Sequence, residues 1–218
     1  MRFDFAATAQ QYGVLMEGLA TTVTLAASAA VLVLAFGCLI ALIRFTAGRT
    51  LNGVVGAYVE VMRNTPLLVT LYLIYFGLPL VGIFLSTFAS ILLAIVMQHS
   101  VFVAEILRGG LLAVPSSQTT AGKGLGMSWL QTFRIVLLPQ ALATALPSLS
   151  GALILLLQDT SLAAAISLVD LTMAAKVISQ RTATSFEPFI VIAVFYLALS
   201  LLVSQIGRML ESRFQFAR

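Results

Sequence analysis

The chain has 218 residues, of which 60% are hydrophobic and 9% are charged, and its formal net charge is +4. Soluble domains carry about 25% charged residues, so this composition excludes a mainly water-facing surface, and lipid must be the main solvent. The positive charge does not indicate nucleic-acid binding, because the basic residues lie between apolar runs, where the positive-inside rule accounts for them. A single cysteine excludes a disulfide framework, and with a single histidine the chain has too few ligands for a metal site.

Several apolar runs approach the length of about 20 residues that a membrane-spanning helix needs. We expect five spans, at residues 18–43, 66–84, 87–107, 135–157 and 189–210, with a short Gly/Ser hinge between the second and the third. Asp4 and Glu17, rather than basic residues, precede the first run, which is also too long for the apolar region of a signal peptide. We therefore expect the first span to remain in the mature protein.

The distribution of Lys and Arg predicts the orientation. With the N-terminus outside, most basic residues face the cytoplasm: Arg44, Arg49, Arg63, Arg108, Lys123, Arg134, Arg208, Arg213 and Arg218. Only Arg2, Lys176 and Arg181 would lie outside. The positive-inside rule thus predicts an N-out, C-in topology in a bacterial inner membrane. No repeat or linker divides the chain, so we expect one membrane domain over residues 1–218.

The cytoplasmic connection over residues 108–139 is too long for a plain turn. Ser116 or Ser117 is expected to cap a short helix after Pro115. Three glycines should end that helix after about two turns: Gly122, Gly124 and Gly126. A second short helix should follow before Pro139 opens the next span, with three apolar residues on one face: Met127, Leu130 and Phe133.

The aromatic side chains of this loop, Trp129 and Phe133, leave two interpretations open. Exposed apolar groups usually mark a contact with another protein. Alternatively, both rings lie in the lipid headgroup layer, which aromatic residues favour.

The loop sequence QTTAGKGLG, from Gln118 to Gly126, is followed nine residues later by VLLP, from Val136 to Pro139. This pattern resembles the EAA loop of ABC importer permeases. The segments RNTPLL, AEILRGGLLAVPSSQ, LLPQALATALPSL and QDTSL occur in the order typical of polar amino acid permeases, the histidine/glutamine/arginine group. The resemblance spans the chain from Glu60 to Asp170.

The resemblance implies an all-α membrane protein with five transmembrane helices in the type I (MetI-like) ABC importer permease fold. It implies three partners: a second permease subunit, a cytoplasmic ATPase dimer and a periplasmic solute-binding protein. ATP and magnesium would belong to the ATPase, since Lys123 lacks the surroundings of a P-loop lysine and this chain needs no cofactor. The residues expected to couple to the ATPase are Ser117, Gln118, Thr120, Ala121, Gly122, Lys123, Leu125, Gly126, Met127, Ser128, Phe133 and Pro139.

Three positions depart from the EAA pattern. Thr120 stands in place of the glutamate, Gly122 in place of the second alanine, and Gly124 in place of a usual alanine. Glycine in a helix costs roughly 0.8–1 kcal/mol relative to alanine, so we expect a looser loop. A loop weakened in this way favours a heterodimer, in which the second permease carries the more standard copy.

Polar residues at membrane depth are candidates for the substrate pathway: Gln98, His99, Asp159, Thr160 and Ser161. Leu162, in the same segment, is a candidate as well. The DTSL segment that begins at Asp159 resembles the family segment facing the translocation path. Asp159 could bind a substrate ammonium group, or make local hydrogen bonds at a helix end. Gln158 stands where the family usually has lysine, which favours basic substrates. A lone histidine within a span is more often hydrogen-bonded between helices than catalytic.

Two acid–base pairs are spaced three residues apart near the inner ends of spans two and three, as is typical of pairs on one helix face: Glu60 with Arg63, and Glu105 with Arg108. They are interpreted as an ionic lattice beside the coupling loop, or equally as ordinary interfacial charges. On the outside, residues 161–179 have helical periodicity, and a polar face containing Asp170 is expected to meet the periplasm.

These features predict a permease subunit that moves polar amino acids from periplasm to cytoplasm by alternating access, energised by a separate ATPase. An importer for an amino-acid-derived solute such as an opine is the alternative within the same class. A self-powered secondary transporter would commonly show internal repeats, which the sequence lacks. An intramembrane hydrolase using Ser150 and His99 is disfavoured, because Ser148 occupies the place of a required glycine.

Overall fold

A computed structural model describes residues 5–214, and nearly all of them are helical. Four helical runs among these residues are long and apolar enough to cross a membrane. They are α2 (Tyr12–Thr46), α5 (Thr87–Leu112), the run Trp129–Ile166 that contains α8 (Leu138–Asp159), and α10 (Glu187–Phe214). Each includes one of the expected spans. Arg2 and Arg218, which contributed to the charge bias, lie outside the described residues.

The fifth span belongs to a bent pair. Helix α3 (Arg49–Arg63) meets the run Leu67–Val81 at an angle of 104°. That run consists of α4 (Leu67–Tyr72), a π-helical turn η1 (Leu73–Gly77) and a 3₁₀ turn η2 (Leu78–Val81). Pro66 explains the break, because proline disfavours helical backbone at the preceding residue. The expected second span is therefore the outer half of the pair, whereas α3 was not expected as a helix.

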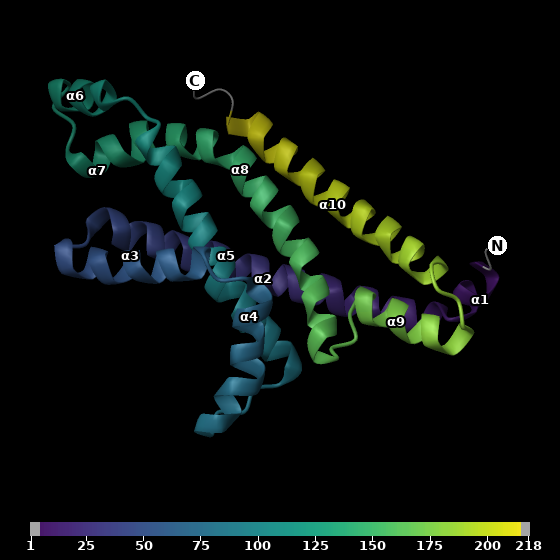
Figure 1. Ribbon diagram of the computed structural model, residues 1–218. Coiled ribbons are helices and arrows are strands. Elements are labelled where there is room, and N and C mark those ends of the chain that lie inside the picture. The colour runs from purple at the N-terminus through teal and green to yellow at the C-terminus, as the bar shows by residue number, and fades with distance from the viewer. Residues whose placement is uncertain (1–4, 215–218) are drawn as a thin grey trace.

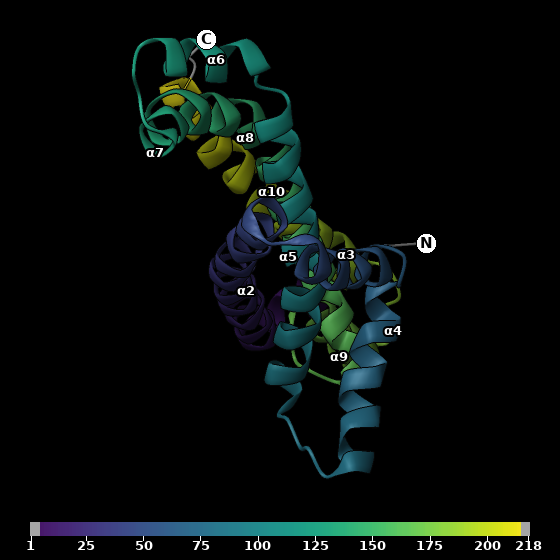
Figure 2. The same ribbon diagram turned by 90° about the vertical axis from the view of Figure 1, so that its left-hand side faces the viewer.

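The spans pack around α5. Helix α2 lies along α5, α5 packs on α8, and α10 runs antiparallel beside α8 (Figures 1 and 2). Small residues permit close approach, as in many membrane helix pairs. A Cβ at Gly37 of α2 would lie 2.7 Å from Cβ of Val103 on α5, and one at Gly110 of α5 would lie 2.6 Å from the Ala141 carbonyl on α8.

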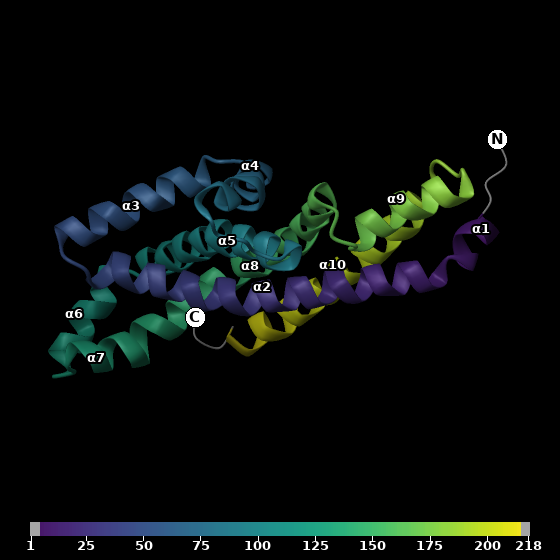
Figure 3. The ribbon, with the colours of Figure 1, turned by 90° about the horizontal axis from the view of Figure 1, so that it is seen from below.

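The shorter elements gather at the two ends of this bundle. At one end, near the last turn of α10, lie α6 (Ser116–Gly124), α7 (Trp129–Gln131) and the π-helical turn η3 (Thr132–Leu137) (Figure 1). At the other end lie α1 (Phe5–Gln10) and α9 (Leu171–Thr182), with α9 alongside α2 and α10 (Figures 1 and 3). The 3₁₀ segment η4 (Thr160–Ile166) leads from α8 towards α9. The first helix therefore begins at one end of the bundle and the last helix finishes at the other, as an N-out, C-in topology requires.

Candidate functional sites: the cytoplasmic loop and the outer end of α8

Helix α6 begins differently from the expectation. Pro115 occupies the N-cap position, and Ser116 and Ser117 are already helical, so the expected serine cap is wrong. Proline at this boundary has a fixed φ that suits a helix start and has no N–H to satisfy. Thr120 is exposed and donates its hydroxyl to the Ser116 carbonyl at 3.4 Å, within its own helix. A threonine side chain is also neutral, so it cannot present a negative charge to a partner, as the glutamate of the EAA pattern would.

Gly126 ends α6 in a Schellman motif. Its φ is +76°, in the left-handed region that glycine adopts without strain. The Met127 N–H donates to the Gly122 carbonyl at 3.0 Å, and the Gly126 N–H donates to the Lys123 carbonyl at 3.0 Å. These bonds satisfy the last carbonyls of the helix and turn the chain sharply.

Two residues later the chain starts the next helix with a capping box. The Gln131 N–H donates to Ser128 Oγ at 3.3 Å, and the Ser128 N–H donates to Gln131 Oε1 at 2.8 Å. The helix then continues from α7 through η3 into α8, with Pro139 in the first turn of α8 as expected. The cytoplasmic elbow, residues 122–131, is thus a helix stop followed at once by a helix start.

Gly122 is buried and packs closely, in contrast to the looseness expected of it. A Cβ there would lie 2.7 Å from both Oγ1 and Cγ2 of Thr132, which is itself 2% exposed. Because Gly122 has no side chain, α6 can pack directly against η3. Gly124, by comparison, has open space around it and makes no such contact.

The loop presents apolar groups to the cytoplasm. The side chain of Leu125 is 80% exposed, and those of Trp129 and Leu130 are more than half exposed. Trp129 stacks on Phe133 with ring centroids 5.3 Å apart, and both contact Phe45 at the end of α2. These stacked rings fix one side of the loop, whereas Leu125 projects with almost no cover from this chain. Such exposure is typical of a contact surface.

At the outer end of α8, two candidate pathway residues from different spans form a pair. His99 Nε2 on α5 lies 2.9 Å from Asp159 Oδ2 at the end of α8. The histidine side chain is 4% exposed and the carboxylate 31% exposed. The expected hydrogen bond of the histidine between helices is present. Asp159 bonds to His99 on another helix rather than within its own helix end, and its binding of a substrate ammonium group stays a prediction.

The other candidate pathway residues are placed differently. Gln98 donates its amide to the Thr65 carbonyl at 2.8 Å, so it stabilises the break between α3 and α4. Thr160 is fully buried and donates to the Leu157 carbonyl at 2.6 Å, and Leu162 packs against the apolar core. Ser161 differs, since it lines a surface hollow of about 410 Å³ together with Gln158, Tyr196 and Ser200.

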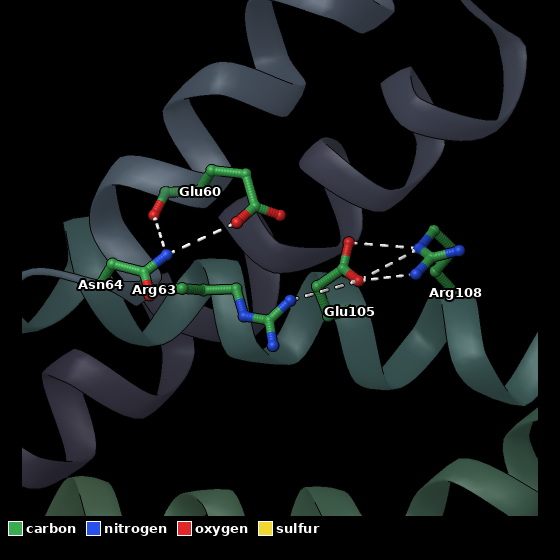
Figure 4. A network of polar contacts seen from close by, with 5 residues as sticks. All are labelled: Glu60, Arg63, Asn64, Glu105 and Arg108. Atoms are coloured by element: carbon green, nitrogen blue, oxygen red, sulfur yellow. Dashed lines mark hydrogen bonds and ion pairs between the residues drawn. The ribbon is translucent and has the colours of Figure 1, made fainter.

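The four expected ionic residues form only part of the expected lattice (Figure 4). Glu105 Oε2 lies 2.7 Å from Arg108 Nη2 and 3.9 Å from Arg63 Nη1, so it bridges α3 and α5. Glu60 does not pair with Arg63: it interacts with Asn64, which donates to the Glu60 carbonyl at 2.7 Å. The Glu60–Arg63 pair is therefore wrong, and the Glu105–Arg108 pair is confirmed.

The start of α9 holds a buried acid whose position differs from the expectation. Asp170, expected on a periplasm-facing surface, is 0% exposed. It is the N-cap of α9, and its carboxylate accepts the Met173 N–H at 2.8 Å. An Asp immediately before a helical pattern is a recognised N-cap signal, which could have located the helix start. Its burial depends on contacts with α2 and α10, which no local signal reveals.

The comparisons with known proteins agree with this architecture. Residues 33–216 match the family of binding-protein-dependent transport system inner membrane components. The chain is 30% identical to the arginine transport system permease protein ArtQ of Bacillus subtilis (strain 168), covering 98% of each. It is 35% identical to the octopine transport system permease protein OccM of Rhizobium radiobacter, covering 97% of this chain and 90% of that protein. A chain in a crystal structure of an amino acid ABC transporter with histidines has 34% identity and a TM-score of 0.91, covering 98% of this chain and 100% of that one.

The chain belongs to the family of binding-protein-dependent transport system inner membrane components. It is a multi-pass permease subunit of an ABC importer in the bacterial inner membrane, and it is not itself an enzyme. ATP is hydrolysed in a separate chain. Consistent with this, Ser150 donates to the Leu146 carbonyl and to Glu211 rather than to His99, so the hydrolase alternative has no support in the described contacts.

Proposed function

We propose that this permease carries polar amino acids, with a preference for basic ones, from a periplasmic solute-binding protein to the cytoplasm. Asp159 supports the proposal, because a half-buried carboxylate beside a histidine, at the outer end of a span, can attract an ammonium or guanidinium group. The relative named for arginine and the structure with histidines favour the basic class, whereas other relatives, at 32–33% identity, are named for glutamine, a neutral polar amino acid. The relative named for octopine, an amino-acid derivative, keeps an opine as the second candidate.

We further propose that the cytoplasmic loop couples this transport to the ATPase dimer. Leu125, at the tip of the elbow, carries the proposal, because an 80% exposed leucine beside exposed Trp129 fits an apolar groove on a partner. The residues proposed to contact or shape that interface are those of the EAA-like pattern named above, from Ser117 to Pro139. Because Thr120 lacks the charge of the pattern glutamate, we favour pairing with a second, different permease whose loop retains it.

Leu125→Ala tests the coupling role. In proteoliposomes with the partner permease, ATPase and binding protein, uptake of radiolabelled arginine should fall about tenfold, as expected for an interface hot spot. The amount of membrane-inserted permease should not change, because Leu125 makes little contact with its own chain. Leu80→Ala is the matched control, since Leu80 is 87% exposed at the opposite end of the molecule. Wild-type uptake and ATPase co-purification in Leu125→Ala would contradict the coupling role.

A further inference from the structure

The carboxylate of Asp170 is buried where three helices meet on the outer side of the bundle. Besides the bond from the Met173 N–H, it accepts a hydrogen bond of 3.2 Å from the hydroxyl of Tyr196 on α10. The Tyr196 hydroxyl also lies 3.3 Å from Thr172 Oγ1 in the first turn of α9. Asp170 therefore connects the start of α9 to a span that follows it in the chain.

The same turn is fixed to α2 from the other side. The Leu171 N–H, the next residue after Asp170, donates to Thr22 Oγ1 at 3.1 Å, and Thr22 is fully buried. One turn away on α2, Gly18 touches the Asp170 backbone: a Cβ there would lie 2.8 Å from the Asp170 carbonyl oxygen. We call this set, Gly18, Thr22, Asp170, Leu171 and Tyr196, the outer junction.

A helix cap does not by itself require this degree of burial. N-cap side chains are usually at the surface, and moving a carboxylate out of water is costly. Burial raises the pKa of the Asp170 carboxyl above its ordinary value, against the hydrogen bonds from Met173, Thr172 and Tyr196, which lower it. The chain tolerates this cost where the start of α9 meets α2 and α10.

The outer junction lies at one end of a short segment whose other end is Asp159. Between the two acids run η4 and a turn in which Ser167, a non-glycine residue, has a left-handed φ of 63°. Such backbone persists only where surrounding contacts hold it. At Ser167 these contacts are local, because its N–H donates to the Ala164 carbonyl at 3.4 Å and the Leu168 N–H donates to the Ala163 carbonyl at 3.2 Å. The ends of the segment are fixed to other helices, by the Asp159–His99 contact upstream and by the outer junction downstream.

We propose that Asp170 is a positioning residue: through the outer junction it fixes η4, and with it the substrate-facing side of residues 159–162. This inference rests on the proposed function of Asp159 and Ser161 in the substrate pathway. Loosening the junction should weaken substrate recognition before it prevents assembly, because no junction bond touches the coupling loop or the α5–α8 contact.

Thr22→Val is the decisive variant. It preserves shape but removes the acceptor for the Leu171 N–H, and Thr22 does not line the hollow beside Ser161. In the reconstituted complex, the KM for arginine uptake should rise about two- to tenfold, the range expected for one lost hydrogen bond, with the maximal rate per assembled complex largely kept. Tyr196→Phe should also raise the KM, but Tyr196 lines the hollow beside Ser161, so Thr22→Val carries the test of the junction. Asp170→Asn should act less, because the amide oxygen can still accept the Met173 N–H.

Thr21→Val is the matched control, since the Thr21 hydroxyl bonds only to the Glu17 carbonyl of its own helix among the described contacts. An unchanged KM in Thr22→Val and Asp170→Asn, with only the amount of complex reduced, would make the junction a folding element and overturn the inference. Asp159→Asn separates this inference from the proposed function. A raised KM there, without one in the junction variants, refutes only the positioning role, whereas an unchanged KM in Asp159→Asn refutes the pathway and the inference together.

Discussion

The cytoplasmic elbow and the outer junction are both built from hydrogen bonds, but over very different separations in the chain. In the elbow, every stabilising bond joins residues at most five positions apart. In the outer junction, the Tyr196–Asp170 bond spans 26 residues and the Leu171–Thr22 bond spans 149. The hydrogen bonds of the elbow therefore need no other helix, and its contact with the bundle is the stacking of Trp129 on Phe45 of α2. The junction, in contrast, exists only when three helices are assembled.

This difference suits the positions of the two regions. A loop that must enter another protein has little of its own chain around it, so local backbone rules must define its geometry. The outer junction has the opposite task, since it must hold parts of the bundle in fixed relation. Changes in the elbow should therefore affect partner binding first. Mild changes in the junction should first affect how η4 is held, and with it substrate recognition, and only a severe clash there should prevent assembly.

The largest expected effect is at the closest contact of the outer junction. Gly18→Leu would place a side chain against the Asp170 carbonyl and the Cβ of Ala174, 2.8 and 2.9 Å from the new Cβ. Backbone cannot yield as a side chain does, so we expect a cost of about 3 kcal/mol, at the upper end for overpacking. The yield of assembled complex, measured by size-exclusion chromatography, should fall more than about tenfold. Gly13→Leu on the same helix, where a Cβ meets nothing within 4 Å, should leave the yield unchanged.

A smaller and more selective effect is expected at the elbow. Gly126→Val forces a β-branched residue into the left-handed region, at a cost of roughly 2 kcal/mol, but nothing lies near its Cβ. Assembly of the permeases should persist, while ATPase co-purification and uptake are lost. Gly124→Ala is the control in the same loop, and should stabilise α6 by about 0.5–1 kcal/mol. Loss of permease assembly in Gly126→Val would break the contrast between the two regions.

The same contrast explains which features could be predicted from the sequence. The spans, the topology and a helix end in the glycine-rich segment follow from composition and local rules, and the structure confirms them. Of the three glycines expected to end the helix, only Gly126 does so, because Gly122 and Gly124 lie within α6. The capping box of Ser128 and Gln131 was also open to a local rule, although we did not predict it. Asp170 was placed on the wrong surface because helical periodicity describes one helix, whereas its burial arises from Thr22 and Tyr196 on other helices.

In the substrate pathway, polar character at membrane depth did not predict which residues act together. Gln98 and His99 are neighbours in sequence and were grouped together, yet their side chains serve different elements. His99 reaches Asp159 on α8, and Gln98 bonds to Thr65 at the α3–α4 break. The two side chains leave α5 in different directions. Gln98 stabilises the break between α3 and α4, and the sequence did not indicate α3 as a helix.

Glu105 makes one contact within its own helix and one with another helix, so it combines the features of the elbow and of the outer junction. Removing its charge should have a smaller effect than the glycine substitutions above. Its pair with Arg108 is local, and its contact with Arg63 joins two helices at 3.9 Å. Both arginine side chains are at least 40% exposed, so water can replace the lost carboxylate. Glu105→Gln should cost about 1 kcal/mol or less, read as a small decrease in the melting temperature of the complex that shrinks further at high salt.

Glu60→Gln provides the comparison for this change. Glu60 interacts with Asn64 on its own helix and has no arginine partner among the described residues, so its substitution should cost less than that of Glu105. The two values rank a contact between helices against a contact within one helix at the same end of the molecule. A larger loss in Glu60→Gln would mean that α3 is held to α5 by something other than the Arg63–Glu105 contact, with Tyr58, which donates to the Met97 carbonyl at 2.7 Å, as the next residue to change.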